Sequence, residues 1–212
     1  MDYIKLIYSN VVTLKTITLD KNINIKIWID TVLKESNIKI NKPYSIIEAD
    51  EWGASDNTIY VKKNYQEDDP YLNKAILKHE VKHLLNNDVL KSKILIGVSS
   101  FLTIQLLPIP ILSLFVLCMS LSINILYWRY FEGEADRFAY EHATDRREIE
   151  QFQQFFLNHK QLIDHIVYHS SYKVIRDNPE LCLNLFEWMI NISHPLCKSR
   201  ADMAAQYLNK YS

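Results

Sequence analysis

The sequence is poor in glycine, cysteine and excess charge, and each shortage excludes a class of protein. Only three of its 212 residues are glycines, and so few, with long apolar and charged stretches between turn signals, favour a mainly helical chain. Three cysteines without a CxxC pair argue against a disulfide framework or a cysteine zinc site. Lysine and arginine total 24 against 25 acidic residues, so no basic excess indicates a nucleic-acid partner.

The first ninety residues predict a small mixed unit. No continuous apolar run opens the chain, so we expect no secretory signal peptide. An amphipathic helix is predicted over residues 22–34, although its start is also compatible with a strand. Short strands rich in Ile, Val and Tyr are predicted for residues 44–48 and 58–62, with a loop over residues 52–57.

Residues 94–128 contain no charged side chain. As one helix this stretch would measure roughly 52 Å, which exceeds a bilayer core of about 30 Å. Pro108 and Pro110 interrupt it near the middle, so a helical hairpin inserted into a membrane is predicted. Trp128 followed by Arg129 is typical of a membrane interface. The alternative is a hairpin buried inside a soluble domain.

Positive charges flank the predicted hairpin on one side. A hairpin returns the chain to the side that it left, and Lys91, Lys93 and Arg129 lie there. Because positive charge marks the cytoplasmic side of membrane proteins, we expect both soluble parts to be cytoplasmic.

Residues 79–83, His-Glu-Val-Lys-His, form an HExxH motif. On a helix, residues four apart share a face, so His79 and His83 can bind one Zn²⁺. Glu80 lies beside them, where it can take a proton from a zinc-activated water and pass it to the leaving amine. The alternative is a chance match on a charged helix, which is rare in a chain of this length.

A metallopeptidase needs a third protein ligand and an open position for water. Glu132 is the candidate. Asp136 follows four residues later on the same helical face, where it can accept a hydrogen bond from the imidazole of a zinc ligand. If HExxH were absent, a solvated acidic helix start would be the better interpretation of Glu132 and Asp136.

Three blocks of sequence occur in order along residues 50–205. They are HEVKHLLNND, with HExxH and then an Asn-x-Asp pattern; EGEADRFA, with ExxAD; and SHPLCKSR, with Ser-His-Pro and a later arginine. In order, spacing and content they resemble the HtpX-like membrane zinc metallopeptidases, gluzincins that include the CAAX prenyl endopeptidases. The apolar hairpin lies between the first two blocks, where HtpX has transmembrane helices. The resemblance implies a zincin-type domain in which His79, His83 and Glu132 hold one zinc ion.

The resemblance also implies roles for residues that the chain by itself does not single out. His194 and Arg200 would lie near the zinc cleft and assist the substrate oxyanion. Taken alone, they would be interpreted as a capped helix start and a surface arginine. An edge strand would pair with the substrate peptide. The residues implied for this strand are Ala54, Thr58, Ile59, Tyr60 and Val61.

We therefore predict a mainly α fold with a small β-sheet, in a reduced member of this group. It has no apolar run before HExxH, Leu196 replaces a frequent proline, and Lys82 places a charge inside the motif. The predicted divisions are an N-terminal part of the catalytic domain at 1–90, the hairpin at 91–129 and a C-terminal helical part at 130–212. Within the last part, helices are expected over residues 145–169, 179–190 and 195–211.

The predicted function is zinc-dependent hydrolysis of peptide bonds in polypeptides in or near the lipid bilayer. One alternative is an inactive, membrane-anchored binding or regulatory protein with the same fold. A third candidate is a pore-forming protein that uses the hairpin alone.

Overall fold

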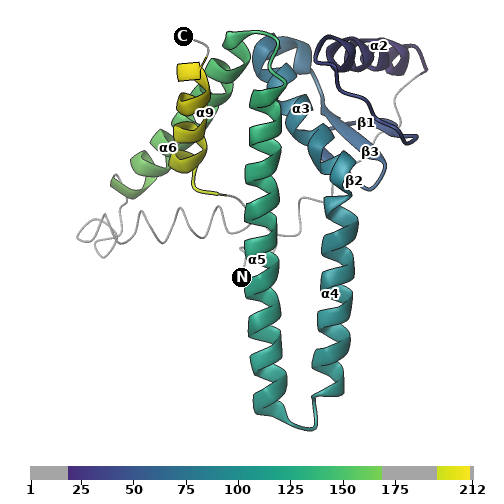
Figure 1. The fold of residues 1–212 in the computed structure, drawn as a ribbon, viewed down its shortest axis with the longest axis vertical. Coiled ribbons are helices and arrows are strands. Elements are labelled where there is room, and N and C mark those ends of the chain that lie inside the picture. The colour runs from purple at the N-terminus through teal and green to yellow at the C-terminus, as the bar shows by residue number, and fades with distance from the viewer. Residues whose placement is uncertain (1–18, 169–194, 211–212) are drawn as a thin grey trace.

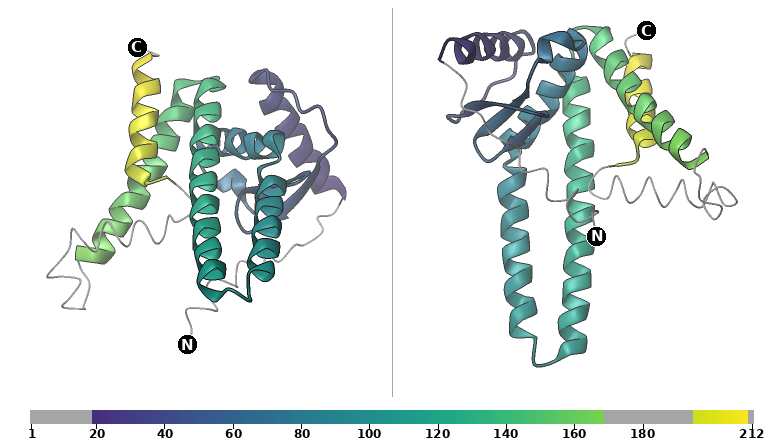
Figure 2. Two further views of the ribbon diagram at one scale, coloured as in Figure 1. Left: turned by 60° about the horizontal axis from the view of Figure 1, so that its bottom comes forward. Right: turned by 180° about the vertical axis from the view of Figure 1, so that it is seen from behind.

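The computed structural model describes residues 19–168 and 195–210, which form a helical body with a long projecting hairpin (Figure 1, Figure 2). The predicted mainly α fold with a small sheet is confirmed. The helix expected over residues 179–190 lies outside the described residues. The described helices are α2 (Leu19–Glu35), α3 (Pro70–Asn86), α4 (Asp88–Gln105), α5 (Pro110–Glu141), α6 (Arg146–Tyr168) and α9 (Cys197–Lys210), with one 3-10 turn at Tyr65–Glu67.

Helix α3 has well-defined ends. Asp69 caps its N-terminus, where the side chain accepts hydrogen bonds from the backbone N–H groups of Tyr71 and Leu72. Pro70 stands in the first turn, where its missing N–H costs nothing. Asn87 adopts a left-handed conformation with φ of 55° and ends the helix. The chain changes direction there, and α4 begins at the next residue.

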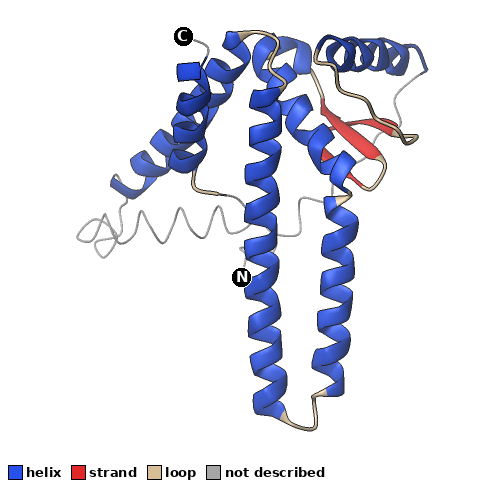
Figure 3. Ribbon diagram, viewed as in Figure 1, coloured by secondary structure: helices blue, strands red, loops and turns tan. Residues whose placement is uncertain are grey.

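The sheet has three strands in the order β1-β3-β2, drawn in red in Figure 3. β1 (Ser45–Ala49) pairs in parallel with β3 (Thr58–Lys62), and β2 (Gly53–Ser55) pairs antiparallel with β3. The strand predictions for β1 and β3 are confirmed to within one residue. The loop predicted over residues 52–57 is wrong in part, because Gly53–Ser55 folds back on β3 through a tight turn. Asp56 has a φ of 41° in that turn.

The prediction that residues 58–61 form a sheet edge is therefore wrong. β3 is the central strand, and hydrogen bonds to β1 and β2 occupy both of its sides. Ala54, in contrast, lies on the outer strand β2. Of the residues predicted to pair with a substrate, Ala54 alone belongs to an edge strand of the described sheet.

Helix α3 lies between two hydrophobic cores. Leu77, Val81 and Leu84 recur at helical spacing and face the first core, which contains the buried side of α2 and Ile59 of the sheet. The second core joins α3 to α5, α6 and α9, and its members include Ala75, Tyr140, Phe152, Phe156 and Ala201. Helix α3 is therefore packed on both sides.

A buried ion pair reinforces the second core. Lys78 of α3 and Glu148 of α6 are both almost fully buried and in direct contact. The Lys78 ammonium also donates to the carbonyl of His142 at 2.9 Å. Because removing one partner of such a pair leaves an uncompensated buried charge, this contact holds α6 in one position against α3.

Helices α4 and α5 form the predicted hairpin and turn at residues 106–109, beside Pro108 and Pro110. Most of their large apolar side chains are exposed, for example Ile111 at 84% and Phe101 at 61%. Within the described residues, α5 is the one helix long and apolar enough to cross a membrane, and 6% of its most apolar stretch is buried. The hairpin is thus not buried within its own chain. Helix α5 continues unbroken from the hairpin into the helical body (Figure 1).

Candidate metal centre

Two imidazoles on α3 lie one helical turn apart and point into the same space. His79 and His83 are 5% and 6% exposed, and their Nε2 atoms are 3.2 Å apart. Both occupy the side of α3 that faces away from Leu77 and Val81 of the first core. Their separation is therefore set by the register of a well-packed helix.

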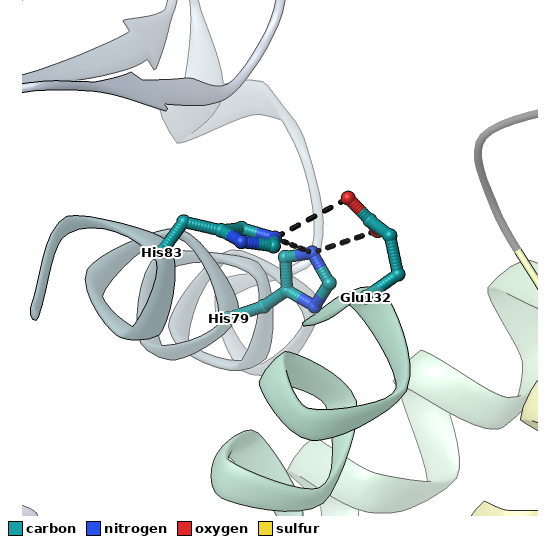
Figure 4. Close-up of side chains that lie close together, drawn as sticks. All are labelled: His79, His83 and Glu132. Carbon is teal, nitrogen blue, oxygen red and sulfur yellow. Dashed lines mark hydrogen bonds and ion pairs between the residues drawn. The ribbon is translucent and has the colours of Figure 1, made fainter. Parts of the chain in front are cut away.

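Glu132 of α5 completes the group, as Figure 4 shows. Its Oε2 atom lies 3.3 Å from His79 Nε2, and its Oε1 atom lies 3.3 Å from His83 Nε2. Ligand atoms bonded at 2.0–2.1 Å to a tetrahedral zinc are roughly 3.3 Å apart. The donor atoms that the sequence predicted as ligands thus lie together at a spacing that fits this ion.

Carboxylates orient both imidazoles. His79 Nδ1 lies 2.9 Å from Asp136 Oδ1, and His83 Nδ1 lies 3.0 Å from Asp88 Oδ2. A carboxylate accepts only, so each Nδ1 carries the proton and donates it. Each Nε2 faces Glu132 and is the nitrogen left to bind a metal when Nδ1 keeps its proton.

Arg200 of α9 donates two hydrogen bonds to Asp136. Its Nε and Nη2 atoms donate to the two carboxylate oxygens at 2.6 and 2.7 Å, and Nη2 is also 3.7 Å from Glu132 Oε2. The guanidinium lies 4.2 Å from the centre of the Phe156 ring. Burial favours the neutral form of Asp136, but the Arg200 guanidinium and the His79 imidazole together outweigh it and hold the pKa of Asp136 below its usual range. Asp136 therefore stays charged and bonded to His79.

Glu80 lines a cleft of about 710 Å³ together with His79, Glu132 and Arg200. Burial raises the pKa of the Glu80 carboxyl, and the nearby Glu132 adds to the shift while the imidazoles oppose it. One wall of the cleft is apolar and comes from α3 and α6, and it consists of Leu72, Ile76, Phe152 and Phe155. The cleft thus joins a carboxylate of raised basicity, a metal-ligand group and space for a substrate.

Comparison with family models decides the class of protein. The model of peptidase family M48 matches residues 64–207, more than half of the chain. The chain belongs to peptidase family M48. Members of this family are zinc metallopeptidases, and the HtpX-like resemblance is confirmed at the level of the family. No curated protein and no solved structure matches the chain.

The centre of this M48 peptidase is rich in negative charge. Four carboxylates, from Glu80, Asp88, Glu132 and Asp136, surround the two imidazoles, and Arg200 is paired with Glu132 and Asp136. Burial alone lowers the pKa of His79, but Asp136 and Glu132 outweigh it and raise the pKa to about 10. A site that stabilises positive charge on an imidazole this strongly is suited to a divalent cation.

The remaining predicted site residues are Arg200, His194 and the strand residues. Arg200 lies at the cleft, where its hydrogen bonds go to Asp136, and its predicted contact with the oxyanion stays a prediction. His194 lies outside the described residues. Of the predicted strand residues, Ala54 follows closely on Trp52, which lines the cleft.

Sequence reasoning gave no role to Asp88, which the structure brings to His83. Asp88 is fully buried although it begins the helix that enters the apolar hairpin. A carboxylate next to a long apolar run is costly unless it has a partner. The position of Asp88 just before the apolar run could be seen in the sequence. Its pairing with His83 could not, because it depends on the turn at Asn87.

Proposed function

We propose that this M48 peptidase is a membrane-anchored zinc endopeptidase that hydrolyses membrane or membrane-proximal polypeptides. The observation that carries the proposal is the set of donor atoms from His79, His83 and Glu132, which are 3.2–3.3 Å apart. This spacing suits a tetrahedral zinc ion with one position open for water. One zinc ion per chain would be held by these three residues.

The chain's own residues divide the remaining work. Zinc, when bound, supplies a Lewis acid that polarises the scissile carbonyl and lowers the pKa of water. Glu80 accepts the proton of the attacking water and returns it to the leaving amine. The raised pKa of Glu80 suits both proton transfers, because a carboxyl whose pKa lies closer to neutral pH can both accept and release a proton. Asp136 and Asp88 keep the imidazoles aligned throughout.

Arg200 and His194 have different proposed roles. Because the guanidinium of Arg200 bonds Asp136 on both oxygens, Arg200 is assigned as a positioning residue for His79. His194 is assigned as the hydrogen-bond donor to the oxyanion, as the family resemblance implies. The extended substrate is assigned to the edge of β2 at Ala54, since β2 is an outer strand that begins next to the cleft.

The exposed hairpin supplies the membrane anchor in this proposal. Its outward side chains are large and apolar, and α5 has the length and composition of a membrane span. Lys91, Lys93 and Arg129 stand at the end nearest the helical body, which assigns that body to the cytoplasmic side. The cleft would then lie close to the bilayer surface, where membrane-tethered polypeptides reach it most easily.

The test uses the full chain in phosphatidylcholine vesicles. Zinc is measured per chain, and hydrolysis is followed on a polypeptide reporter tethered to the same vesicles. Glu80→Gln should keep one zinc ion and lose hydrolysis by about 10²–10⁴-fold, because the proton acceptor is removed and the ligands remain. The control Glu134→Gln changes a carboxyl two residues from Glu132 that pairs with Arg137, and it should leave hydrolysis intact.

Each other outcome counts against the proposal in a distinct way. Zinc without hydrolysis in the natural sequence would favour the inactive binding protein. Natural protein that holds no zinc, or His79→Ala protein that holds as much zinc as the natural one, would overturn the metal site itself.

A further inference from the structure

Both arms of the hairpin continue directly into the metal centre. Helix α4 begins at Asp88, whose carboxylate bonds His83. Helix α5 leaves the hairpin and carries Glu132 and then Asp136 without interruption. The positions of the two arms therefore set the positions of one ligand and of the acceptors for both imidazoles.

Polar side chains join the arms just below the metal centre, and we call Asp88, Ser92, Asn124 and Trp128 the hairpin seam. The Trp128 indole N–H donates to Ser92 Oγ at 3.0 Å, and Ser92 Oγ donates to Asn124 Oδ1 at 3.3 Å. Ser92 is 4% exposed. The Trp128 ring also packs on the imidazole of His83, with ring centroids 6.3 Å apart. The seam thus contacts the ligand His83 from two sides, through Asp88 and through Trp128.

The seam and the third ligand share one face of α5. Asn124, Trp128, Glu132 and Asp136 follow at intervals of four residues, so they form one stripe along the helix. The distance along the axis from Asn124 to Glu132 is about 12 Å at 1.5 Å per residue. An unbroken helix of this length turns and shifts as one body, so a displacement at Asn124 reaches Glu132.

The other arm, α4, makes polar contacts with residues in and before the sheet. Lys93 bonds Asp56 in the β2–β3 turn at 2.7 Å. Asn87, at the start of α4, accepts a hydrogen bond from the ammonium of Lys42. Relative movement of the arms therefore moves Glu132 on α5 against His83 and Asp88.

We propose that the hairpin seam positions His83 and Glu132 for zinc, so that the packing of the two arms sets the zinc affinity. Trp128 is the principal positioning residue, because it alone in the seam contacts both the opposite arm and a ligand imidazole. This inference rests on the proposed function, since it takes zinc as the ion at this centre. The hairpin then supports the geometry of the site as well as anchoring the protein.

The experiment measures zinc affinity by competition with a chelator, using the full chain in dioleoylphosphatidylcholine vesicles. Trp128→Phe keeps a ring against His83 but loses the bond to Ser92, and Ser92→Ala loses the same bond from the other arm. Each should weaken zinc binding about tenfold, as changes to groups that orient ligands do. The matched control is Ser122→Ala, whose exposed hydroxyl donates to the carbonyl of Cys118 in its own helix. It should stay within about twofold of the natural protein.

A second readout separates positioning from loss of stability. With cobalt in place of zinc, the visible spectrum reports ligand geometry, and it should change in Trp128→Phe. Ile29→Val trims the first core, on the side of α3 opposite the two imidazoles, and should lower the unfolding midpoint without changing the spectrum or the affinity. Natural affinity and an unchanged spectrum in both Trp128→Phe and Ser92→Ala would overturn the inference and leave the proposed function standing. If the natural chain bound no zinc, both would fall.

Discussion

The two imidazoles of the metal centre are held by similar bonds but in different surroundings. His79 donates to Asp136, which Arg200 fixes from α9 with two further bonds and which is fully buried. His83 donates to Asp88, which is equally buried, but Asp88 pairs with the half-exposed Lys91 at 4.0 Å. The difference teaches that the His79 side is locked inside the helical body, whereas the His83 side depends on the hairpin.

Asp136→Ala should have the largest effect on both stability and zinc affinity. It removes the acceptor of His79 and leaves the buried guanidinium of Arg200 without its carboxylate. Loss of one partner of a buried pair costs about 3–5 kcal/mol of unfolding free energy, and loss of the acceptor costs up to about 100-fold in zinc affinity. Denaturant unfolding and chelator competition measure the two quantities. A variant as stable as the natural protein would contradict the claim that Asp136 and Arg200 hold His79 in the helical body.

Arg200→Lys should have an intermediate effect. Lysine keeps the positive charge but cannot reproduce the two-pronged contact with Asp136 or the flat contact with Phe156. We expect a loss of about 2 kcal/mol in unfolding free energy, together with weaker zinc binding through the loosened Asp136. Arg137→Lys, at an exposed position paired with Glu134, is the matched control and should change neither. Equal losses in both variants would refute a special role for Arg200.

Asp88→Asn should have the smallest effect on stability. Asparagine still offers an oxygen to His83, and no buried cation loses its partner. We expect about 1 kcal/mol or less in unfolding free energy and a loss of zinc affinity of about tenfold at most. The loss of zinc affinity in Asp88→Asn should vary with the lipid around the hairpin, whereas the loss in Arg200→Lys should not. Identical lipid dependence in the two variants would remove the distinction between the sides.

The helix with HExxH was predictable because helical register alone brings His79 and His83 together. Glu132 was a candidate from its acidic cluster with Asp136, and the family resemblance supported it. Its position could not be predicted, since the approach of α5 to α3 is a long-range contact that no local pattern encodes. The hairpin followed from the uncharged run and its prolines. Family membership and the mainly helical fold are thus confirmed, and the three predicted ligands lie together.

Two features escaped prediction for physical reasons. β2 has three residues, Gly53–Ser55, without a β-branched side chain, so neither alternation nor composition marks it as a strand. Without β2, the sequence predicted β3 as the edge. Asp88 escaped because its direction depends on the left-handed turn at Asn87, which folds the first residue of α4 back toward His83.

The unbroken path of α5 constrains how the length of this protein can change. Each added or deleted residue rotates the rest of a helix by about 100°. A single insertion between Trp128 and Glu132 would turn the carboxylate away from both imidazoles. Insertions or deletions at residues 106–109, at the far tip, would leave the orientation of Glu132 relative to Trp128 unchanged. Variation in hairpin length among natural sequences of this type should therefore collect at the tip.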